Sequence, residues 1–239
     1  MGEAEPVERQ TAAAGPMLGF VGGTGPHGRG LTLRFAAAGH HVVVGSRDAA
    51  RAEEVIGGLP DGLAGTVEAE DNPTACARAD IIFVTVPYDA QRGLLPRLRD
   101  AVGGKLVVSC ANPLVFDERG PRPLRPDSGS AAEEVAALLP SATVVGAFQN
   151  VSAVTLRRLD ESMDCDVLIC GDDVAATATV ARLVDGVPGL RPIDAGPLRL
   201  SGAVEALTAV LLAVNATYKT HAGVRLAGVD GRRTGFGTP

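Results

Sequence analysis

Aromatic side chains are scarce in this sequence of 239 residues, which contains no tryptophan, two tyrosines and six phenylalanines. Because 46% of the residues are nevertheless hydrophobic, aliphatic side chains must fill the interior. Strands rich in valine, isoleucine and leucine are typical of parallel sheets that are covered by helices on both faces. A chain of this length can form one large domain or two modest ones.

Lysine is almost absent, with only Lys105 and Lys219, and the formal net charge is −6. Proteins that bind nucleic acid need clustered lysine and arginine side chains for the phosphate backbone. The charge balance therefore argues against nucleic acid as the main partner.

The cysteines form no Cys-x-x-Cys pair and have no neighbouring histidine, which argues against a zinc site or a thioredoxin-like motif. We expect buried free thiols and no metal site; the four cysteines are Cys76, Cys110, Cys165 and Cys170.

No apolar run is long enough to cross a membrane. The longest, Ala209–Val214 with its neighbours, is interrupted by Thr208 and Asn215, whereas a spanning helix needs about 20 apolar residues. Residues 1–16 are polar and acidic and lack the apolar core of a signal peptide. We expect a disordered tail over residues 1–16, a cytoplasmic location and no membrane partner.

Glycine, in contrast, is abundant, and residues 23–28 (Gly-Thr-Gly-Pro-His-Gly) directly follow an apolar run, residues 17–22, that predicts a buried strand. The pattern over residues 30–39 predicts a helix ended by Gly39. In a dinucleotide-binding βαβ unit, one glycine permits the tight turn, the next admits the pyrophosphate, and the third lets helix pack on strand. Gly23, Gly25 and Gly28 are the corresponding candidates, although 30 glycines can also produce this spacing by chance in a loop.

The residues after the second apolar run, residues 41–44, favour NADP. NAD sites usually place Asp or Glu there for the ribose 2′-hydroxyl, whereas a 2′-phosphate needs donors and positive charge. This chain has Ser46 and Arg47, and Arg51 adds a cation one helical turn later. Asp48 keeps NAD open as an alternative, in which Arg47 is an ordinary surface arginine.

Two further apolar runs, residues 80–87 and 105–110, end in loops that contain Pro87 and Pro113. Both predict strands of one parallel sheet, and ligands of open α/β sheets collect at the carboxyl ends of such strands. Val86, Pro87 and Ala111 are therefore candidate contacts for the nicotinamide. Ordinary turn chemistry explains the prolines equally well.

The remaining pattern predicts an α/β protein with a Rossmann-type, doubly wound, mostly parallel sheet. Residues 17–148 form the expected NADP domain, and residues 149–239 form a smaller C-terminal α+β domain. Asp117–Gly129 is expected to be a mobile loop, and Asp172-Asp173 to begin a helix rather than bind a metal. The other predicted helices are 48–57, 89–98, 130–139 (opened by a capping box at Ser130), 174–185 and 202–218; the other strands are 66–70, 143–148, 166–170 and 189–195.

Several separate segments resemble the NADPH-dependent F420 reductases, also called F420H2:NADP oxidoreductases. They extend over nearly all of residues 17–221, and the Asp-Ala-Gly-Pro-Leu run at 194–198 is more specific than the glycine motif. The matching segments are residues 22–31, 44–47, 130–133, 170–173 and 189–198.

The resemblance implies that NADP is bound through Thr24, Ser46, Arg47 and Arg51, with backbone contacts near Gly25, His27 and Pro87. It places the deazaflavin between the two domains, at Gln149 to Val151 and at Ala206 through Thr208. Members of the family often have His at the position of Gln149 and Ser at that of Ala206, whereas Thr208 agrees. Gln149 can still donate a hydrogen bond to a ring carbonyl but cannot carry charge.

The implied activity is reversible hydride transfer between NADP(H) and the deazaflavin coenzyme F420. This is cofactor chemistry that needs stacked rings and the exclusion of water, so no catalytic side chain is expected. Two alternatives remain: an NADPH-dependent reductase of a flavin, ferric chelate or imine, and a protein that senses NADPH without turnover. The apolar run Leu207–Val214 is compatible with a homodimer interface or with packing against the sheet.

Overall fold

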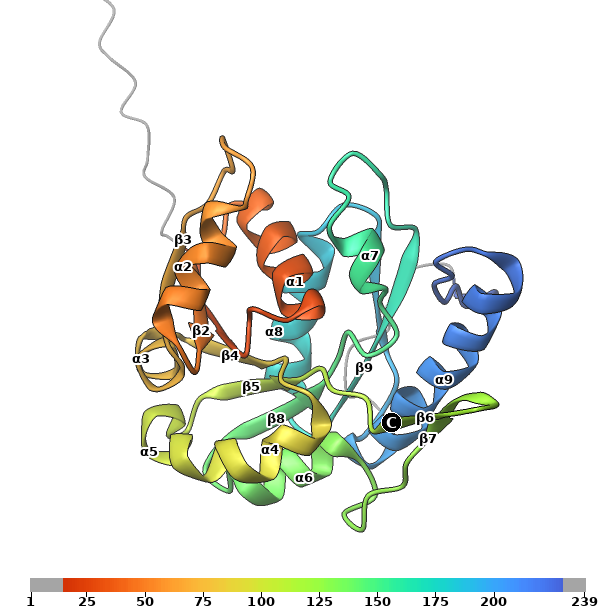
Figure 1. The fold of residues 1–239 in the computed structure, drawn as a ribbon. Coiled ribbons are helices and arrows are strands. Elements are labelled where there is room, and N and C mark those ends of the chain that lie inside the picture. The colour runs from red at the N-terminus through yellow and green to blue at the C-terminus, as the bar shows by residue number, and fades with distance from the viewer. Residues whose placement is uncertain (1–14, 230–239) are drawn as a thin grey trace, which may run out of the picture.

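A computed structural model describes residues 15–229, so nearly all of the expected N-terminal tail lies outside the described residues. Within this range the chain alternates strands and helices (Figure 1). The first half contains β1 (Leu18–Val21), α1 (Pro26–Ala37), β2 (Val42–Ser46), α2 (Ala49–Gly57), β3 (Val67–Asp71), α3 (Asn72–Arg78), β4 (Ile81–Val84), α4 (Tyr88–Leu94), a 3₁₀ turn (Leu95–Leu98), α5 (Arg99–Val102) and β5 (Leu106–Ser109).

A β-hairpin opens the second half. The elements after it complete the sheet and end in the longest helix described: β6 (Leu114–Asp117), β7 (Gly120–Pro123), α6 (Ala131–Leu138), β8 (Thr143–Gly146), α7 (Ala153–Leu156), β9 (Cys165–Gly171), α8 (Val174–Asp185), β10 (Leu190–Asp194), a 3₁₀ turn (Leu198–Leu200) and α9 (Ser201–Tyr218).

Eight strands form one sheet in the order β10-β9-β8-β5-β4-β1-β2-β3. All neighbours are parallel except β8 and β9, which pair antiparallel through Val145–Gly171 and Gly146–Cys170. The predicted α/β, mostly parallel, doubly wound fold is therefore confirmed. The sheet runs across residue 148, and the division into two domains at that position stays a prediction.

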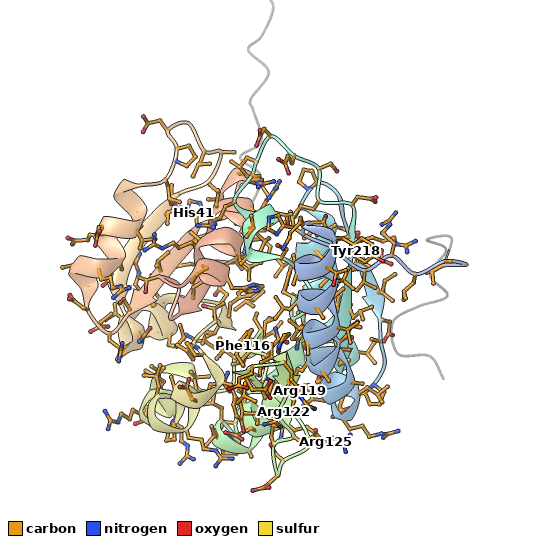
Figure 2. The ribbon with its side chains drawn as sticks, turned by 45° about the vertical axis from the view of Figure 1, so that its right-hand side comes forward. His41, Phe116, Arg119, Arg122, Arg125 and Tyr218 are labelled. Carbon is orange, nitrogen blue, oxygen red and sulfur yellow. The ribbon has the colours of Figure 1, made fainter. Side chains whose placement is uncertain are left out.

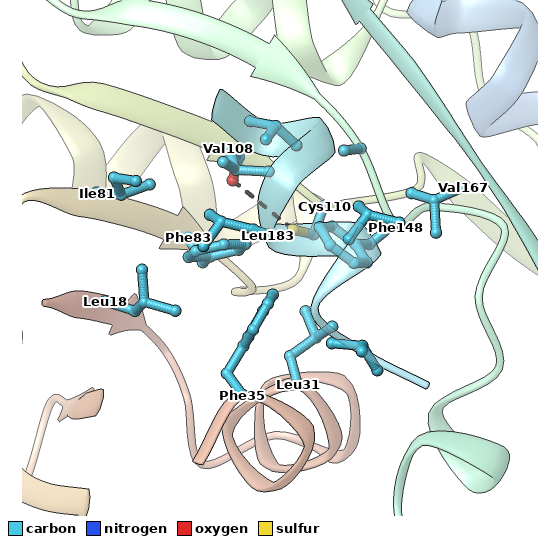
Figure 3. Packing of buried hydrophobic residues seen from close by; sticks show 14 of the residues in the cluster. Leu18, Leu31, Phe35, Ile81, Phe83, Val108, Cys110, Phe148, Val167 and Leu183 are labelled. Atoms are coloured by element: carbon cyan, nitrogen blue, oxygen red, sulfur yellow. Dashed lines mark hydrogen bonds between the residues drawn. The ribbon is translucent and has the colours of Figure 1, made fainter. Parts of the chain in front are cut away.

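Helices cover both faces of the sheet, which explains why its strands are apolar throughout. Helices α1, α2 and α8 contribute to the core on one face, and α3, α5 and α6 to the core on the other. Four of the six phenylalanines gather in the first core, where the rings of Phe20 and Phe83 stack at 4.8 Å. Phe35 and Phe148 meet edge to face there at 5.9 Å (Figure 3). The four cysteines are buried free thiols, as expected.

Two of the predicted helix boundaries have clear physical explanations. Ser130 is confirmed as the N-cap of α6, because its Oγ accepts a hydrogen bond from the Glu133 backbone N–H at 3.0 Å. The Glu133 carboxylate of the expected capping box accepts from Ser130 Oγ, at 2.8 Å. Helix α1, in contrast, begins at Pro26, not at Gly30. Proline is well suited to the first helical position because its fixed φ is already helical and its missing N–H is not needed there.

The hairpin of β6 and β7 and the short helices α3, α5 and α7 were not predicted. Asp117–Gly129, expected to be a mobile loop, begins within the hairpin of β6 and β7, in which Pro121 pairs with Phe116. Helices α3, α5 and α7 contain seven, four and four residues. Elements this short carry too few apolar repeats for a helical period to be recognised.

Helix α9 is longer than its apolar run suggested. The helical segment Leu198–Tyr218 has 21 residues and a mean hydropathy of 1.5, so by length and composition it could cross a membrane; 22% of its most apolar stretch is buried. Its N-terminal half is nevertheless attached to the rest of the protein. Glu205 is buried and accepts hydrogen bonds from the backbone N–H groups of Ala131 and Ala132, at 2.8 and 3.1 Å, at the start of α6.

Candidate cofactor site

The glycine-rich loop connects β1 to α1 and is held from three sides. Asn72 Oδ1 accepts a hydrogen bond from the Gly22 N–H at 3.2 Å, and the Gly45 carbonyl accepts one from the Gly23 N–H at 3.1 Å. Arg29 Nε donates to the Thr24 carbonyl at 2.8 Å. The backbone of this loop is therefore fixed by protein groups alone.

The glycines of the loop differ in what a side chain at each position would contact. A Cβ on Gly28 would lie 2.7 Å from the Gly23 Cα, and a Cβ on Gly23 would lie 2.9 Å from the Phe20 Cβ, so close packing explains both residues. A Cβ on Gly25 would meet nothing nearer than the Gly22 carbonyl oxygen at 3.8 Å. Since no protein atom forbids a side chain at Gly25, that glycine keeps space open for something outside the chain.

A cleft of about 1370 Å³ opens beside this loop. Its walls come from residues that follow the carboxyl ends of β1, β2, β3, β4 and β5, and the switch in strand order, between β1 and β4, falls within it. Open α/β sheets bind ligands at this position. The predicted site residues that line the cleft are Thr24, Gly25, His27, Ser46, Arg47, Arg51, Val86, Pro87 and Ala111; Gly23 and Gly28 are not among the lining residues.

Cations border one end of the cleft. Arg47 and Arg51 are exposed, and neither makes an ion pair with any residue between 15 and 229. The Asp48 carboxylate is already used, because it caps α2 by accepting a hydrogen bond from the Ala50 N–H at 3.0 Å. Ser46 is buried, and its Oγ accepts a hydrogen bond from the Asp48 N–H at 3.3 Å. This end therefore offers positive charge and a hydroxyl, and an Asp48 carboxylate oxygen is engaged by the α2 backbone.

His27 lies in the first turn of α1 and lines the cleft. Burial lowers the pKa of its imidazole to about 4, because a buried ring cannot hold a charge cheaply. Its Nε2 has no hydrogen-bond partner among the residues that the structure describes. The side chain is thus neutral at pH 7.

The hairpin of β6 and β7 forms the other end of the cleft, through Leu114, Val115, Phe116 and Leu124. Phe116 is 70% exposed, which is unusual for a phenylalanine. Figure 2 shows it beside α9 on the same side of the molecule as the hairpin arginines, with Tyr218 toward the other end of that helix. This end of the cleft is apolar, in contrast to the end with Arg47 and Arg51.

None of the four residues expected at the deazaflavin, Gln149, Val151, Ala206 and Thr208, is among the lining residues of the cleft. The Gln149 side chain points inward, is 2% exposed, and donates from Nε2 to the Ser109 carbonyl at 3.1 Å. Val151 is buried in the core that contains Phe148, and Ala206 is partly buried.

Thr208 lies next to the cleft rather than in its wall. Its Oγ1 is 2.9 Å from the Gln149 carbonyl and 3.2 Å from Asn112 Oδ1, and Asn112 Nδ2 donates to the same Gln149 carbonyl at 3.0 Å. Asn112 does line the cleft. These three residues therefore connect the cleft wall, the loop after β8 and helix α9.

Phe148, directly before Gln149, has φ of +69° and is fully buried. This left-handed conformation is costly for a bulky residue and persists only where the surroundings enforce it. The loop that contains Gln149 is therefore held in one shape by packing and hydrogen bonds.

Two residues of the cleft wall, Asn72 and Asn112, and the buried Arg34 of α1 were not predicted from the sequence. Asn72 and Asn112 stand just after β3 and β5, and polar residues at the carboxyl ends of parallel strands are the signal that could have identified them. Arg34 interrupts an apolar helix face, and a lone arginine among buried positions was the signal there.

The fold and the cleft define a protein of the Rossmann-type, dinucleotide-binding class. A family model described as NADP oxidoreductase, coenzyme F420-dependent, matches residues 17–113. The F420-dependent NADP reductase of Methanocaldococcus jannaschii is 34% identical over 221 residues, which are 89% of this chain and 99% of that protein. The enzyme of the same name from Methanothermobacter thermautotrophicus is 36% identical over 218 residues, 87% of this chain and 94% of that protein.

A similar fold is seen in the crystal structure of a proposed F420-dependent NADP reductase from Arthrobacter sp. FB24. Its TM-score is 0.75 with 22% sequence identity, and the match covers 88% of this chain and 99% of that one. With the two archaeal relatives, the assignment is plain: this chain belongs to the family of F420-dependent NADP reductases.

Proposed function

We propose that the protein transfers a hydride reversibly between NADP(H) and coenzyme F420. The observation that carries the proposal is the cleft, in which an unobstructed Gly25 at a helix N-terminus stands beside two unpaired arginines and leads to an apolar far end. The names of the relatives supply the second cofactor. The bound cofactors supply the hydride donor and acceptor atoms, and the chain supplies binding, orientation and exclusion of water.

The pyrophosphate of NADP fits at the start of α1. The first turn of a helix has unpaired N–H groups and the positive end of the helix dipole, and α1 has no side-chain cap and no acidic residue in that turn. A phosphate placed there takes the position of the missing cap, and the absence of a Cβ at Gly25 lets it approach the backbone.

The 2′-phosphate fits at Ser46, Arg47 and Arg51. Guanidinium groups bind phosphate through charge-assisted hydrogen bonds, and these two have no competing carboxylate in the part of the chain described. Asp48, the residue that kept NAD open, has its carboxylate turned to the α2 backbone. This arrangement supports NADP over NAD.

The two rings would meet where Val86, Pro87 and Ala111 line the cleft. Val86 and Ala111 are buried apolar residues that exclude water from the reacting carbons. We place the deazaflavin between this wall and the segment held by Gln149 and Thr208, with Val151 and Ala206 behind. No side chain is given an acid or base role, because hydride transfer between the rings needs none.

The direct test mixes purified protein, NADPH and oxidised coenzyme F420 and follows the deazaflavin absorbance. Loss of that absorbance with stoichiometric oxidation of NADPH supports the proposal. Unchanged absorbance across the pH range overturns it. Parallel reactions with a flavin, a ferric chelate and a cyclic imine identify the alternative reductases, and tight NADPH binding without turnover on any acceptor identifies a sensor.

We also propose that α9 is covered by a second copy of the chain in the cytoplasm. Val210 and Tyr218 are 57% and 75% exposed on a helix with a mean hydropathy of 1.5, and a soluble enzyme rarely leaves such a surface uncovered. Light scattering should give a dimer for the wild type and a monomer for Val210→Glu. Val174→Glu is the matched control, because Val174 is 50% exposed on α8; equal dimer content in all three proteins would contradict the interface.

A further inference from the structure

Helix α1 carries a second polar feature two turns after the glycine-rich loop. Arg34 is buried, with 4% of its surface exposed, and its guanidinium faces the end of helix α7. Nε donates to the Leu156 carbonyl at 3.0 Å. Nη2 lies 2.9, 2.5 and 3.1 Å from the carbonyl oxygens of Thr155, Arg158 and Glu161.

The acceptors are all backbone carbonyls, and they belong to the last turn of α7 and the segment directly after it. The last carbonyls of a helix have no partner within the helix, and a cation there is favoured by the helix dipole. No carboxylate among the described residues forms an ion pair with Arg34. The arginine is therefore used as a fork that fixes backbone, and lysine lacks the planar set of donors for this geometry.

A close contact one turn earlier joins the same two helices. A Cβ at Gly30 would lie 2.5 Å from the Leu156 Cβ and 3.5 Å from the Ala153 carbonyl oxygen. Glycine at this position lets α7 rest directly on α1. Gly30 and Arg34 thus fix both the separation and the orientation of the two helices.

The two joined segments have different tasks in the proposed function. The N-terminus of α1 holds the proposed NADP pyrophosphate site, whereas α7 comes directly after the loop Gln149–Val151 that we assign to the deazaflavin, separated from it only by Ser152. That loop is anchored on its other side by Asn150, whose side chain bonds to the Asp166 carbonyl at 2.6 Å and to the Leu168 N–H at 3.4 Å on β9. Arg34 is the buried polar link from the loop's helix to the NADP-binding helix.

We infer that Arg34 is a positioning residue for hydride transfer: it sets the distance between the nicotinamide and the deazaflavin by clamping α7 to α1. The inference rests on the proposed function. A rigid contact between the two helices keeps the donor and acceptor carbons near reaction distance. A displacement of about 1 Å from that distance can lower the rate of transfer about 100-fold. Arg34 itself touches neither ring.

The test measures the transfer step with NADPH and with NADPH deuterated at the transferred position, by stopped flow at several temperatures. Arg34→Met should slow this step about 10- to 100-fold, make the isotope effect depend more strongly on temperature, and weaken deazaflavin binding. The Kd for NADPH should change by less than about twofold, because the glycine-rich loop keeps its own hydrogen bonds.

Lys105→Met is the matched control. Lys105 Nζ donates to the Cys76 and Ala77 carbonyls at the end of α3, at 2.6 and 2.7 Å, so this variant also removes a cation from helix-terminal carbonyls but leaves α7 alone. It should lose stability and keep the wild-type isotope effect. If both variants lose stability alike and neither changes the isotope effect, Arg34 is merely structural and the inference is overturned.

Three further variants keep the test decisive if Arg34→Met does not fold. Arg34→Lys keeps the charge and loses the fork, and it should show a smaller effect of the same kind. Gly30→Ala should push α7 away and reproduce the altered isotope effect, and Gly30→Ala combined with Leu156→Ala should restore it by making room for the new methyl group. Failure of the rescue counts against the geometry.

Hydrogen exchange separates this inference from the proposed function. In Arg34→Met, the amides of residues 149–158 should exchange faster while those of residues 22–30 stay as in the wild type, whether or not the protein reduces coenzyme F420. A wild type without transfer activity would overturn the proposed function. Unchanged exchange at residues 149–158 would overturn the role of Arg34.

Discussion

Beside the glycine-rich loop, arginine side chains and the first turn of α1 present unpaired donors to the cleft, whereas the Gln149 backbone carbonyl is already bonded to Asn112 and Thr208. Arg47, Arg51 and the first turn of α1 lack protein partners in the described part of the chain, and a Cβ at Gly25 would be unobstructed. Asn112 and Thr208 instead bond to the Gln149 backbone carbonyl and to each other over 2.9–3.2 Å. The cleft presents unpaired donors beside the glycine-rich loop, and the Gln149 segment is a scaffold outside the cleft lining.

The difference teaches how each end can recognise a cofactor. An end with unpaired donors gains a full set of hydrogen bonds when phosphate arrives, so single side chains there should dominate affinity. The Gln149 backbone carbonyl is already paired, so a cofactor that binds beside this segment gains no new hydrogen bond from it and depends on the shape of the segment. Substitutions there should act through the position of the backbone.

The largest expected effects concern two glycines of the same loop, one of which should affect NADPH binding and the other the stability of the fold. Gly25→Ala should leave the free energy of unfolding within about 0.5 kcal/mol and weaken NADPH binding more than 100-fold, on the order of 3 kcal/mol. Gly28→Ala should destabilise the protein by about 1–3 kcal/mol, because its Cβ would lie 2.7 Å from the backbone of Gly23. Urea unfolding and NADPH titration of both variants measure this. Similar stability losses in the two would remove the distinction.

Arg47→Ala should cause the second largest loss of NADPH affinity. Removing a charge-assisted hydrogen bond to phosphate costs about 1.5–3 kcal/mol, which is roughly 10- to 150-fold in the Kd for NADPH. NADH lacks the 2′-phosphate, so its Kd should hardly change. Arg182→Ala on α8 is a control for the lost charge. If NADPH and NADH lose affinity equally, the 2′-phosphate does not bind at Arg47.

Thr208→Val tests the scaffold end and should have a smaller effect. It removes the hydroxyl shared by the Gln149 carbonyl and Asn112, which should raise the KM for the deazaflavin about 10-fold, or about 1.4 kcal/mol, and leave the KM for NADPH unchanged. Thr217→Val on the same helix is the control, because Thr217 bonds only within α9. An equal rise for both substrates would show a general loosening of the fold.

Glu205→Gln should have the smallest effect at pH 7, and it should mainly change how the free energy of unfolding depends on pH. Burial raises the pKa of its carboxyl to about 7, and the nearby charge of Glu133 adds to the rise, while the hydrogen bonds from Ala131 and Ala132 oppose it. The folded protein therefore holds this proton more tightly than the unfolded chain, whose pKa is near 4.5.

The stabilisation due to Glu205 is complete below about pH 4.5 and is lost as the pH rises through 7, by up to about 3 kcal/mol. Glu205→Gln should flatten this part of the stability profile between pH 5 and 8, measured by urea unfolding. Glu53→Gln, at an exposed position on α2, should retain the wild-type slope. Identical slopes in the wild type and Glu205→Gln would place the dependence elsewhere.

The same contrast explains what the sequence could predict. The glycine-rich loop, Ser46 and Arg47 are recognisable because strand, turn and helix follow each other within about 30 residues, so local spacing encodes the geometry. The inward orientation of Gln149 is set by Ser109, which is 40 residues away in the sequence and on another strand. No local pattern contains that contact.

The roles of Arg34 and Asn112 could not be predicted for the same reason, because the carbonyl groups that they bind lie far away in the sequence. The hairpin escaped for a different one. Its second strand contains Pro121 and Pro123, which cannot donate to a ladder and so resemble loop residues, although an isolated two-stranded edge tolerates them.

The antiparallel seam between β8 and β9 has a consequence for how this enzyme could be recombined. The strands from β1 to β5, together with β8, form a parallel six-stranded layer, and the chain after β8 is attached to that layer by two backbone pairs and by packed helices. A chimera that exchanges the chain after Gly146 for that of another reductase must match the two strand positions, the partner of Gly30 and the four carbonyls at Arg34. It must also keep the hydrogen bonds that join Gln149, Thr208 and Glu205 to Ser109, Asn112 and the start of α6. The chain after β8 can therefore be exchanged only together with the partners of these contacts, while the strands from β1 to β5 keep their register.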